Sequence, residues 1–182
     1  MELLKKTIRD EEDKRKDNSD KKELFEKERH PKSADFYKEE WSCVEDKEAR
    51  ENIAYQMQYL EFLVLLYNDY QIYLTIESLL CKNIMAIIAG IVESSLYCLV
   101  NQSYQKADLN SEPTTDFIKL IRDAYDLELI DKNMKDDFHR LRKIRNLIHL
   151  KGIAYQEHDA YTIEETNRYL DTLNKFREKI KK

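Results

Sequence analysis

The sequence contains few of the residues that make turns: among 182 residues there are only two glycines and two prolines. With so few turn formers, and with 37% charged residues, long helices joined by few connections are expected. Short alternating segments of β-branched residues bounded by Asn-Gly or Asp-Gly turns are also missing, which argues against an all-β fold. We therefore predict an all-α protein, an up-and-down bundle of four to five helices.

Cysteine is scarce as well, and its pattern excludes two kinds of site. Cys43, Cys81 and Cys98 are odd in number and widely spaced, and no CxxC or Cys/His cluster occurs. A disulfide scaffold and a zinc site are therefore not expected. Buried thiols in a reducing compartment fit this pattern, so we predict a cytoplasmic protein without a metal or another cofactor.

No long hydrophobic run is present. The N-terminus lacks the apolar core of a signal peptide. The most apolar run, Asn83–Val92, is bounded by Lys82 and Glu93 and is shorter than the roughly 20 residues that a membrane span requires. The sequence therefore predicts a soluble protein with no membrane partner. A glycine-rich phosphate loop, an HExxH motif and a GxSxG motif are missing too.

Charge divides the chain into two parts. Of the first fifty residues thirty are charged, fourteen basic and sixteen acidic, and their apolar residues are too sparse for a continuous apolar face. We predict a charged N-terminal arm over residues 1–45, either a solvated helix or a disordered lead-in. Phe36, Tyr37 and Trp41 are candidates to dock the end of this arm onto the core. Residues 46–182 are predicted to form the helical domain.

Apolar residues at helical spacing predict the helices of that domain. One helix is expected from about Lys47 to a break at Asn68-Asp69, and a second from about Ile72 to Gln102. The second is apolar over most of its circumference, so we expect it to be the central core helix. Glu93 within it is a carboxylate that needs a partner if it is buried. Further helices are predicted at 115–127, at 138–152 and after Thr162, where Thr162 and Glu165 form a capping-box pattern.

The helix predicted at 138–152, FHRLRKIRNLIHLKG, has two different sides. Leu141, Ile144, Leu147 and Ile148 lie on one side at about 100° per residue, and a polar set lies on the other. From Phe138 to Gln156 there are five basic residues and no acid, in a chain of net charge −5. We call residues 138–152 the basic stretch and predict that it is the functional surface. Its polar side carries Arg142, Arg145, Asn146 and His149.

An arginine beside a histidine has a specific chemical use. A neutral imidazole such as that of His149 can accept the proton of a ribose 2′-hydroxyl, because its pKa lies near neutral pH. A guanidinium can bind the phosphate and stabilise the charge that grows in the transition state. These groups suffice for metal-free cleavage of RNA to a 2′,3′-cyclic phosphate and a free 5′-hydroxyl. Ion pairs of Arg142 or Arg145 with Asp136, Asp137 or Glu93 are the structural alternative.

The stretch HRLRKIRNLIHLKG resembles the signature of HEPN domains, all-α domains frequent in prokaryotic toxins, phage-defence proteins and RNA-processing nucleases. The hallmark of that family is an Arg, four to six further residues, and a His, often with Asn directly after an Arg. The segment IIAGIVESSLYCLV is similar to the family's central helix, which often carries an acidic residue where Glu93 stands. The resemblance covers roughly residues 48–179 and leaves the charged arm outside it.

The resemblance implies roles for individual residues. Arg142 meets the family spacing, with six residues before His149, whereas Arg145 is followed by the Asn of the family's Arg-Asn pair. It implies that Arg142, Arg145, Asn146 and His149 are catalytic, with Arg142 as the phosphate ligand, Arg145 and Asn146 assisting it, and Glu93 in support. The other basic residues of the stretch are expected to bind RNA: Arg140, Lys143 and Lys151.

The resemblance also implies partners. In active members of the family, two signature helices meet across a two-fold axis, so we expect a homodimer through the basic stretch. Single-stranded RNA is the expected substrate, since in-line attack by the 2′-hydroxyl needs a flexible backbone. A toxin or phage-defence effector is the expected cellular role, and an antitoxin or other protein a further candidate partner. The alternative is a non-catalytic HEPN-like dimeric module that binds RNA or a protein.

Overall fold

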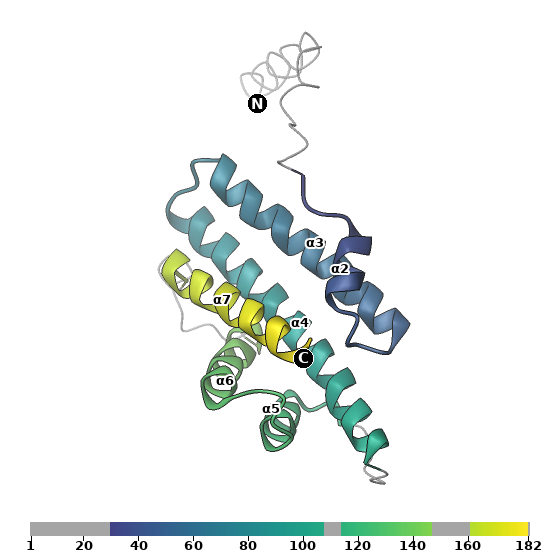
Figure 1. The fold of residues 1–182 in the computed structure, drawn as a ribbon. Helices are drawn as coiled ribbons and strands as arrows, with labels where there is room; N and C mark the ends of the chain where they lie inside the picture. The colour runs from purple at the N-terminus through teal and green to yellow at the C-terminus, as the bar shows by residue number, and fades with distance from the viewer. Residues whose placement is uncertain (1–29, 108–113, 147–160, 182) are drawn as a thin grey trace, which may run out of the picture. The chain divides into compact units, whose positions relative to one another are not determined.

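A computed structural model of the chain describes residues 30–107, 114–146 and 161–181. Within these ranges the secondary structure is entirely helical, which confirms the predicted all-α class. Residues 31–182 form one compact unit (Figure 1). The helices are α2 (Ala34–Glu40), α3 (Lys47–Asp69), α4 (Leu74–Lys106), α5 (Phe117–Asp126), α6 (Lys132–Asn146) and α7 (Ile163–Ile180).

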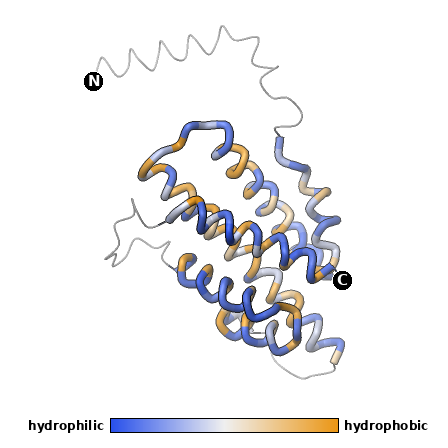
Figure 2. The backbone as a smooth tube through the Cα atoms, turned by 60° about the vertical axis from the view of Figure 1, so that its left-hand side comes forward, coloured by the Kyte–Doolittle hydropathy of each residue, from blue (hydrophilic) through white to orange (hydrophobic). Residues whose placement is uncertain are grey.

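The long helix α4 is the centre of the compact unit, as its apolar sequence predicts. It packs against α3, α5, α6 and α7, and in Figure 1 α3 and α7 run alongside it. Ile84, Ile88 and Val92 are almost completely buried by these neighbours. Figure 2 shows apolar and polar segments alternating along the helices, as expected where each helix turns one side to a shared core.

By length and composition alone, α4 is apolar enough to cross a membrane. In its most apolar 18-residue window, however, 61% of the residues are buried inside the protein. The apolar character is therefore explained by packing against four other helices, and α4 is the core helix of the compact unit.

Side-chain caps determine where several helices begin. The Asp46 carboxylate accepts a hydrogen bond from the amide of Ala49 and starts α3. The predicted Thr162 cap of α7 is confirmed, because its hydroxyl accepts from the amide of Glu165 at 3.2 Å. The helix predicted from residue 115 begins at Phe117 instead, since the Asp116 carboxylate accepts from the amide of Ile118 and caps the helix there.

The compact unit begins at Pro31, so residues 31–45, predicted as the end of the charged arm, belong to the same unit as the helical domain. The reason is that this segment supplies core side chains. Trp41 is fully buried, with its ring 6.2 Å from that of Phe176, and Tyr37 is 4% exposed. The Tyr37 hydroxyl also donates to Glu61 at 2.6 Å. Phe36, the third candidate, is 37% exposed.

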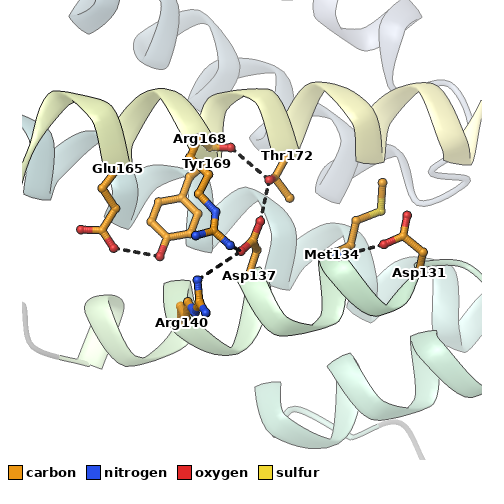
Figure 3. A network of polar contacts seen from close by, with 8 residues as sticks. All are labelled: Asp131, Met134, Asp137, Arg140, Glu165, Arg168, Tyr169 and Thr172. Carbon is orange, nitrogen blue, oxygen red and sulfur yellow. Dashed lines mark hydrogen bonds and ion pairs between the residues drawn. The ribbon is translucent and has the colours of Figure 1, made fainter.

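A buried carboxylate joins α6 to α7 (Figure 3). Asp137 of α6 accepts a hydrogen bond from the Thr172 hydroxyl at 2.9 Å and forms a close ion pair with Arg168, both on α7. Asp137 is 5% exposed, so these partners compensate for its desolvation. Because the carboxylate fixes one side of α6 against α7, it also fixes the rotation of α6 about its axis.

Candidate functional site

Helix α6 carries the part of the basic stretch that the structure describes, and its two sides differ as predicted. Leu141 is completely buried and Ile144 is 9% exposed, whereas Arg145 and Asn146 are exposed. Leu147, Ile148 and His149 lie outside the described residues. The amphipathic pattern is thus confirmed from Phe138 to Asn146, and the position of the predicted base stays a prediction.

Two of the predicted site residues are brought together. The Arg145 guanidinium of α6 lies 2.8 Å from the Glu93 carboxylate of α4, although the two residues are far apart in the sequence. The Glu93 side chain is 20% exposed and that of Arg145 is 44% exposed. Burial raises the pKa of Glu93, and the positive charge of Arg145 partly opposes that rise. The ion pair between Arg145 and Glu93, one of the structural alternatives, is therefore present.

This ion pair lies in the wall of a cleft of about 560 Å³, which we call the α4–α6 cleft. Four helices and the segment before α5 contribute to it. The cleft is lined by Asp46, Ala49, Asn52, Glu93, Ser94, Tyr97, Cys98, Thr115, Leu120 and Arg145. Among the lining residues that the structure describes, Arg145 is the only one with a positive charge, and Asp46 and Glu93 carry negative charges.

The remaining groups of the cleft are polar, aromatic or inert. Tyr97 is 37% exposed, and Asn52 and Ser94 are exposed, so a ligand in the cleft can contact all three. Burial raises the pKa of the Cys98 thiol to about 11, so this cysteine stays protonated near neutral pH and is a poor nucleophile. None of Asn52, Ser94 and Tyr97 was predicted to be in the site. Asn52 reaches it through the packing of α3 against α4, whereas Ser94 and Tyr97 follow Glu93 on α4 itself, and the i, i+4 spacing of Glu93 and Tyr97 is the signal that could have indicated Tyr97.

The other arginines and lysines of α6 lie apart from the cleft. Arg142 is half-buried, and its Nε has no hydrogen-bond partner within the described part of the chain. Arg140 points toward α7, with a nitrogen 3.9 Å from Asp137. Lys143 is exposed. The predicted catalytic pair of Arg142 and Arg145 is therefore divided, and only Arg145 lines the cleft.

The histidines need a separate account. His149 is outside the described residues, as are His158 and Lys151. His139 is half-buried on α6. Burial and the nearby charges of Arg142 and Lys135 lower its pKa, so the imidazole of His139 is neutral around pH 7. The described residues contain no group of three His, Cys, Asp or Glu that could hold a metal ion.

Comparisons of the chain with protein-family models, with curated proteins and with solved structures find no match. The HEPN resemblance therefore stays an expectation drawn from the sequence. What the geometry adds is one cationic group, Arg145, held 2.8 Å from Glu93 in the wall of a cleft of about 560 Å³.

Proposed function

We propose that the protein is a metal-independent endoribonuclease that cleaves single-stranded RNA at the α4–α6 cleft. The observation that carries the proposal is the position of Arg145. Its guanidinium is 44% exposed in the cleft wall and is oriented by Glu93 at 2.8 Å. A guanidinium has five N–H donors, so donors remain for a phosphate when one edge is bound to a carboxylate.

The proposed reaction needs a base, an acid and a group that stabilises negative charge. His149 accepts the proton of the 2′-hydroxyl, the 2′-oxygen bonds to phosphorus, and the bond to the 5′-oxygen breaks. A second acid, an imidazolium or water, protonates the departing 5′-oxygen. Arg145 balances the negative charge that increases on the phosphoryl oxygens. The products are a 2′,3′-cyclic phosphate and a 5′-hydroxyl. The role of His149 in this scheme rests on the sequence alone.

Glu93 has a supporting role in this scheme. Without RNA, its carboxylate neutralises Arg145 and holds the guanidinium at the cleft. A phosphate that binds Arg145 then either displaces the Glu93 carboxylate or binds the guanidinium beside it. Arg142, Asn146, Arg140, Lys143 and Lys151 supply further contacts to the RNA backbone. The proposed cellular role is that of a cytoplasmic toxin or phage-defence effector.

A second function has one specific observation in its favour. Because Arg145 already has a carboxylate partner, the pair can be a structural contact, and the basic stretch then serves to bind RNA or a protein without cleavage. This non-catalytic module is the alternative from the sequence, and it predicts a different result in the same assay.

The deciding experiment incubates the purified protein with single-stranded RNA in EDTA and analyses the product ends. We expect 2′,3′-cyclic phosphate ends, no cleavage by His149→Ala, and a rate about 10²–10³-fold lower for Arg145→Ala, as for the loss of one charge-stabilising donor. Lys175→Ala is the matched control, because Lys175 is exposed on α7, which contributes no residue to the cleft.

Two results would overturn the proposal. If the RNA stays intact while it binds in a salt-sensitive manner, the non-catalytic module is correct. If His149→Ala cleaves as fast as the parent chain, the nuclease activity belongs to a contaminant or to another site.

A further inference from the structure

Large exposed apolar residues are concentrated at the start of α4. Tyr70 and Tyr73, just before the helix, are 65% and 64% exposed. Leu74 and Ile76, in its first turn, are 82% and 69% exposed, and Leu79 one turn later is 40% exposed. Single exposed apolar residues are ordinary, but five within ten residues form a patch that needs an explanation.

The patch continues along α4 as a regular stripe. Ile76, Leu79, Asn83, Ala86 and Gly90 are separated by three, four, three and four residues, which is the spacing of the contact positions in a coiled coil. We call these five residues the outer seam. A hollow of about 130 Å³ lies on it, between Leu79, Lys82, Asn83 and Ala86. At Gly90 an added Cβ would meet nothing within 4 Å.

We infer that the outer seam binds a second copy of this chain, with the two α4 helices antiparallel and the two-fold axis at Asn83. The order of side-chain sizes favours this occupant. Large residues, Ile76 and Leu79, precede Asn83, and small residues, Ala86 and Gly90, follow it. An antiparallel pair centred on Asn83 places Ile76 opposite Gly90 of the other copy, so the large side chain at one end of the seam meets the residue without a side chain at the other end. Leu79 then lies level with Ile87 of the other copy and next to its Ala86.

The charges of the region also favour self-association. The seam itself carries no charged residue. Glu77 is turned toward its own chain, where its carboxylate accepts a hydrogen bond from the Tyr67 hydroxyl at 2.6 Å, and Lys82 is only 8% exposed. In a chain of net charge −5, the uncharged residues of the seam can meet a second copy without like-charge repulsion between them.

The exposed area is sufficient for such a contact. The five apolar side chains between Tyr70 and Leu79 expose roughly 500–600 Å², which is at the upper end of the patches that monomers usually carry. One partner of a standard interface contributes about 800 Å². The polar and small residues of the seam and their neighbours can supply the remainder.

This dimer has a geometric consequence for the α4–α6 cleft. Glu93 lies ten residues from the axis, so at 1.5 Å per residue the two copies of Glu93 are about 30 Å apart along the helices. The two clefts are then separate, which differs from a composite cleft at the basic stretch. The inference does not depend on RNA cleavage, because it concerns only the association of two chains.

Two substitutions, Gly90→Ala and Leu79→Glu, test the inference. Gly90→Ala removes a helix-destabilising residue at a site with free space, so the melting temperature of the monomer should rise. The same methyl group occupies the space needed by Ile76 of the other copy, so the dimer dissociation constant should increase by about tenfold or more in sedimentation equilibrium. Leu79→Glu should give a monomer, and Ile118→Glu on α5, at similar exposure, should not.

Cross-linking identifies the axis. Asn83→Cys, adjacent to its counterpart across the axis, should form a cross-linked dimer with a short thiol reagent, and the parent chain, with its three cysteines, is the control. Cross-linking through Asn146→Cys and not through Asn83→Cys would instead support a dimer at the basic stretch. A chain that is monomeric at every concentration, or dimers unaffected by Gly90→Ala and Leu79→Glu, would overturn the inference and leave the seam to another occupant.

Discussion

Two opposing influences act on the Glu93 carboxyl. Burial raises its pKa above the ordinary value and Arg145 lowers it, with burial the larger. A carboxyl whose pKa is higher in the folded state binds more protons there. Its contribution to stability is therefore fully present below the unfolded-state pKa and is lost as the pH rises through the folded-state pKa. The ionised form near neutral pH depends on Arg145 for compensation.

Replacing Arg145 by alanine tests this dependence. We expect the free energy of unfolding to fall by about 1–2 kcal/mol at neutral pH, less than for a fully buried pair because Arg145 is 44% exposed. In acid, where Glu93 is protonated, the loss should shrink toward zero. Urea denaturation at both pH values measures it, and Glu93→Gln should remove the pH dependence. An equal loss at both pH values would mean that the two side chains do not interact.

The Asp137 carboxylate is the second residue with a large expected effect. Asp137→Ala deprives Arg168 and Thr172 of their partner between α6 and α7, so we expect a loss of about 2–4 kcal/mol. Thr172→Val removes one hydrogen bond and should cost about 1 kcal/mol. The exposed neighbour Asp136 provides the control, since Asp136→Ala should change the stability by less than about 0.5 kcal/mol. Chemical denaturation of the four proteins makes the comparison.

At the scale of elements, α2 and the residues after it should behave as part of the core. Trp41→Ala leaves a large cavity beside Phe176, and we expect a loss of about 3–5 kcal/mol. Phe36→Ala, within α2 but 37% exposed, should cost about 1 kcal/mol or less. Thermal unfolding followed by circular dichroism gives both values. Similar losses for the two variants would contradict the structure.

The same reasoning separates two truncations. A chain without residues 1–29 keeps Tyr37 and Trp41 and should melt near the temperature of the full chain. A chain without residues 1–45 loses both and should melt much lower or fail to fold. If the shorter truncation already abolished the transition, the compact unit that begins at Pro31 would not be an independent folding unit.

Helices were predictable from the sequence where two signals agree. The apolar spacing from Lys47 and the break at Asn68-Asp69 give α3 almost as it is, and the capping box gives the start of α7. The short helix α2 was not predicted, because its charged sequence resembles the arm before it. The position of this segment in the core depends on a few large side chains, chiefly that of Trp41. The composition of the segment as a whole is dominated by charged residues and does not show their contribution.

At the scale of the whole molecule, the candidate site was predictable only in part. The sequence indicates α6 as the functional helix and Glu93 as a possible partner of Arg145, because both are unusual in their local context. It does not indicate Asn52, which lines the cleft only because α3 and α4 pack together as they do. Tyr97 could have been predicted, because it lies four residues after Glu93 on the same helix. The sequence does not predict that Arg142 is kept out of the cleft lining, since the rotation of α6 is fixed by Asp137 and its partners on α7.

The distribution of charge over the molecule leads to a last prediction. The whole chain has a net charge of −5, so RNA should bind only where cations cluster, on the basic stretch. With about three to five phosphates contacted, the logarithm of the binding constant should fall with the logarithm of salt concentration with a slope of about −2 to −3.5. Arg140→Ala and Lys143→Ala should each reduce that slope by about 0.7, as expected for one phosphate contact.

Fluorescence anisotropy with a labelled single-stranded RNA over a series of salt concentrations measures these slopes. Lys175→Ala on α7 should leave the slope unchanged, because a charge outside the basic stretch releases no counterion from bound RNA. A slope that falls equally for Lys175→Ala and for Lys143→Ala would mean that RNA is attracted by scattered charges. The basic stretch would then have no special role, since a localised site requires that only its own cations determine the salt dependence.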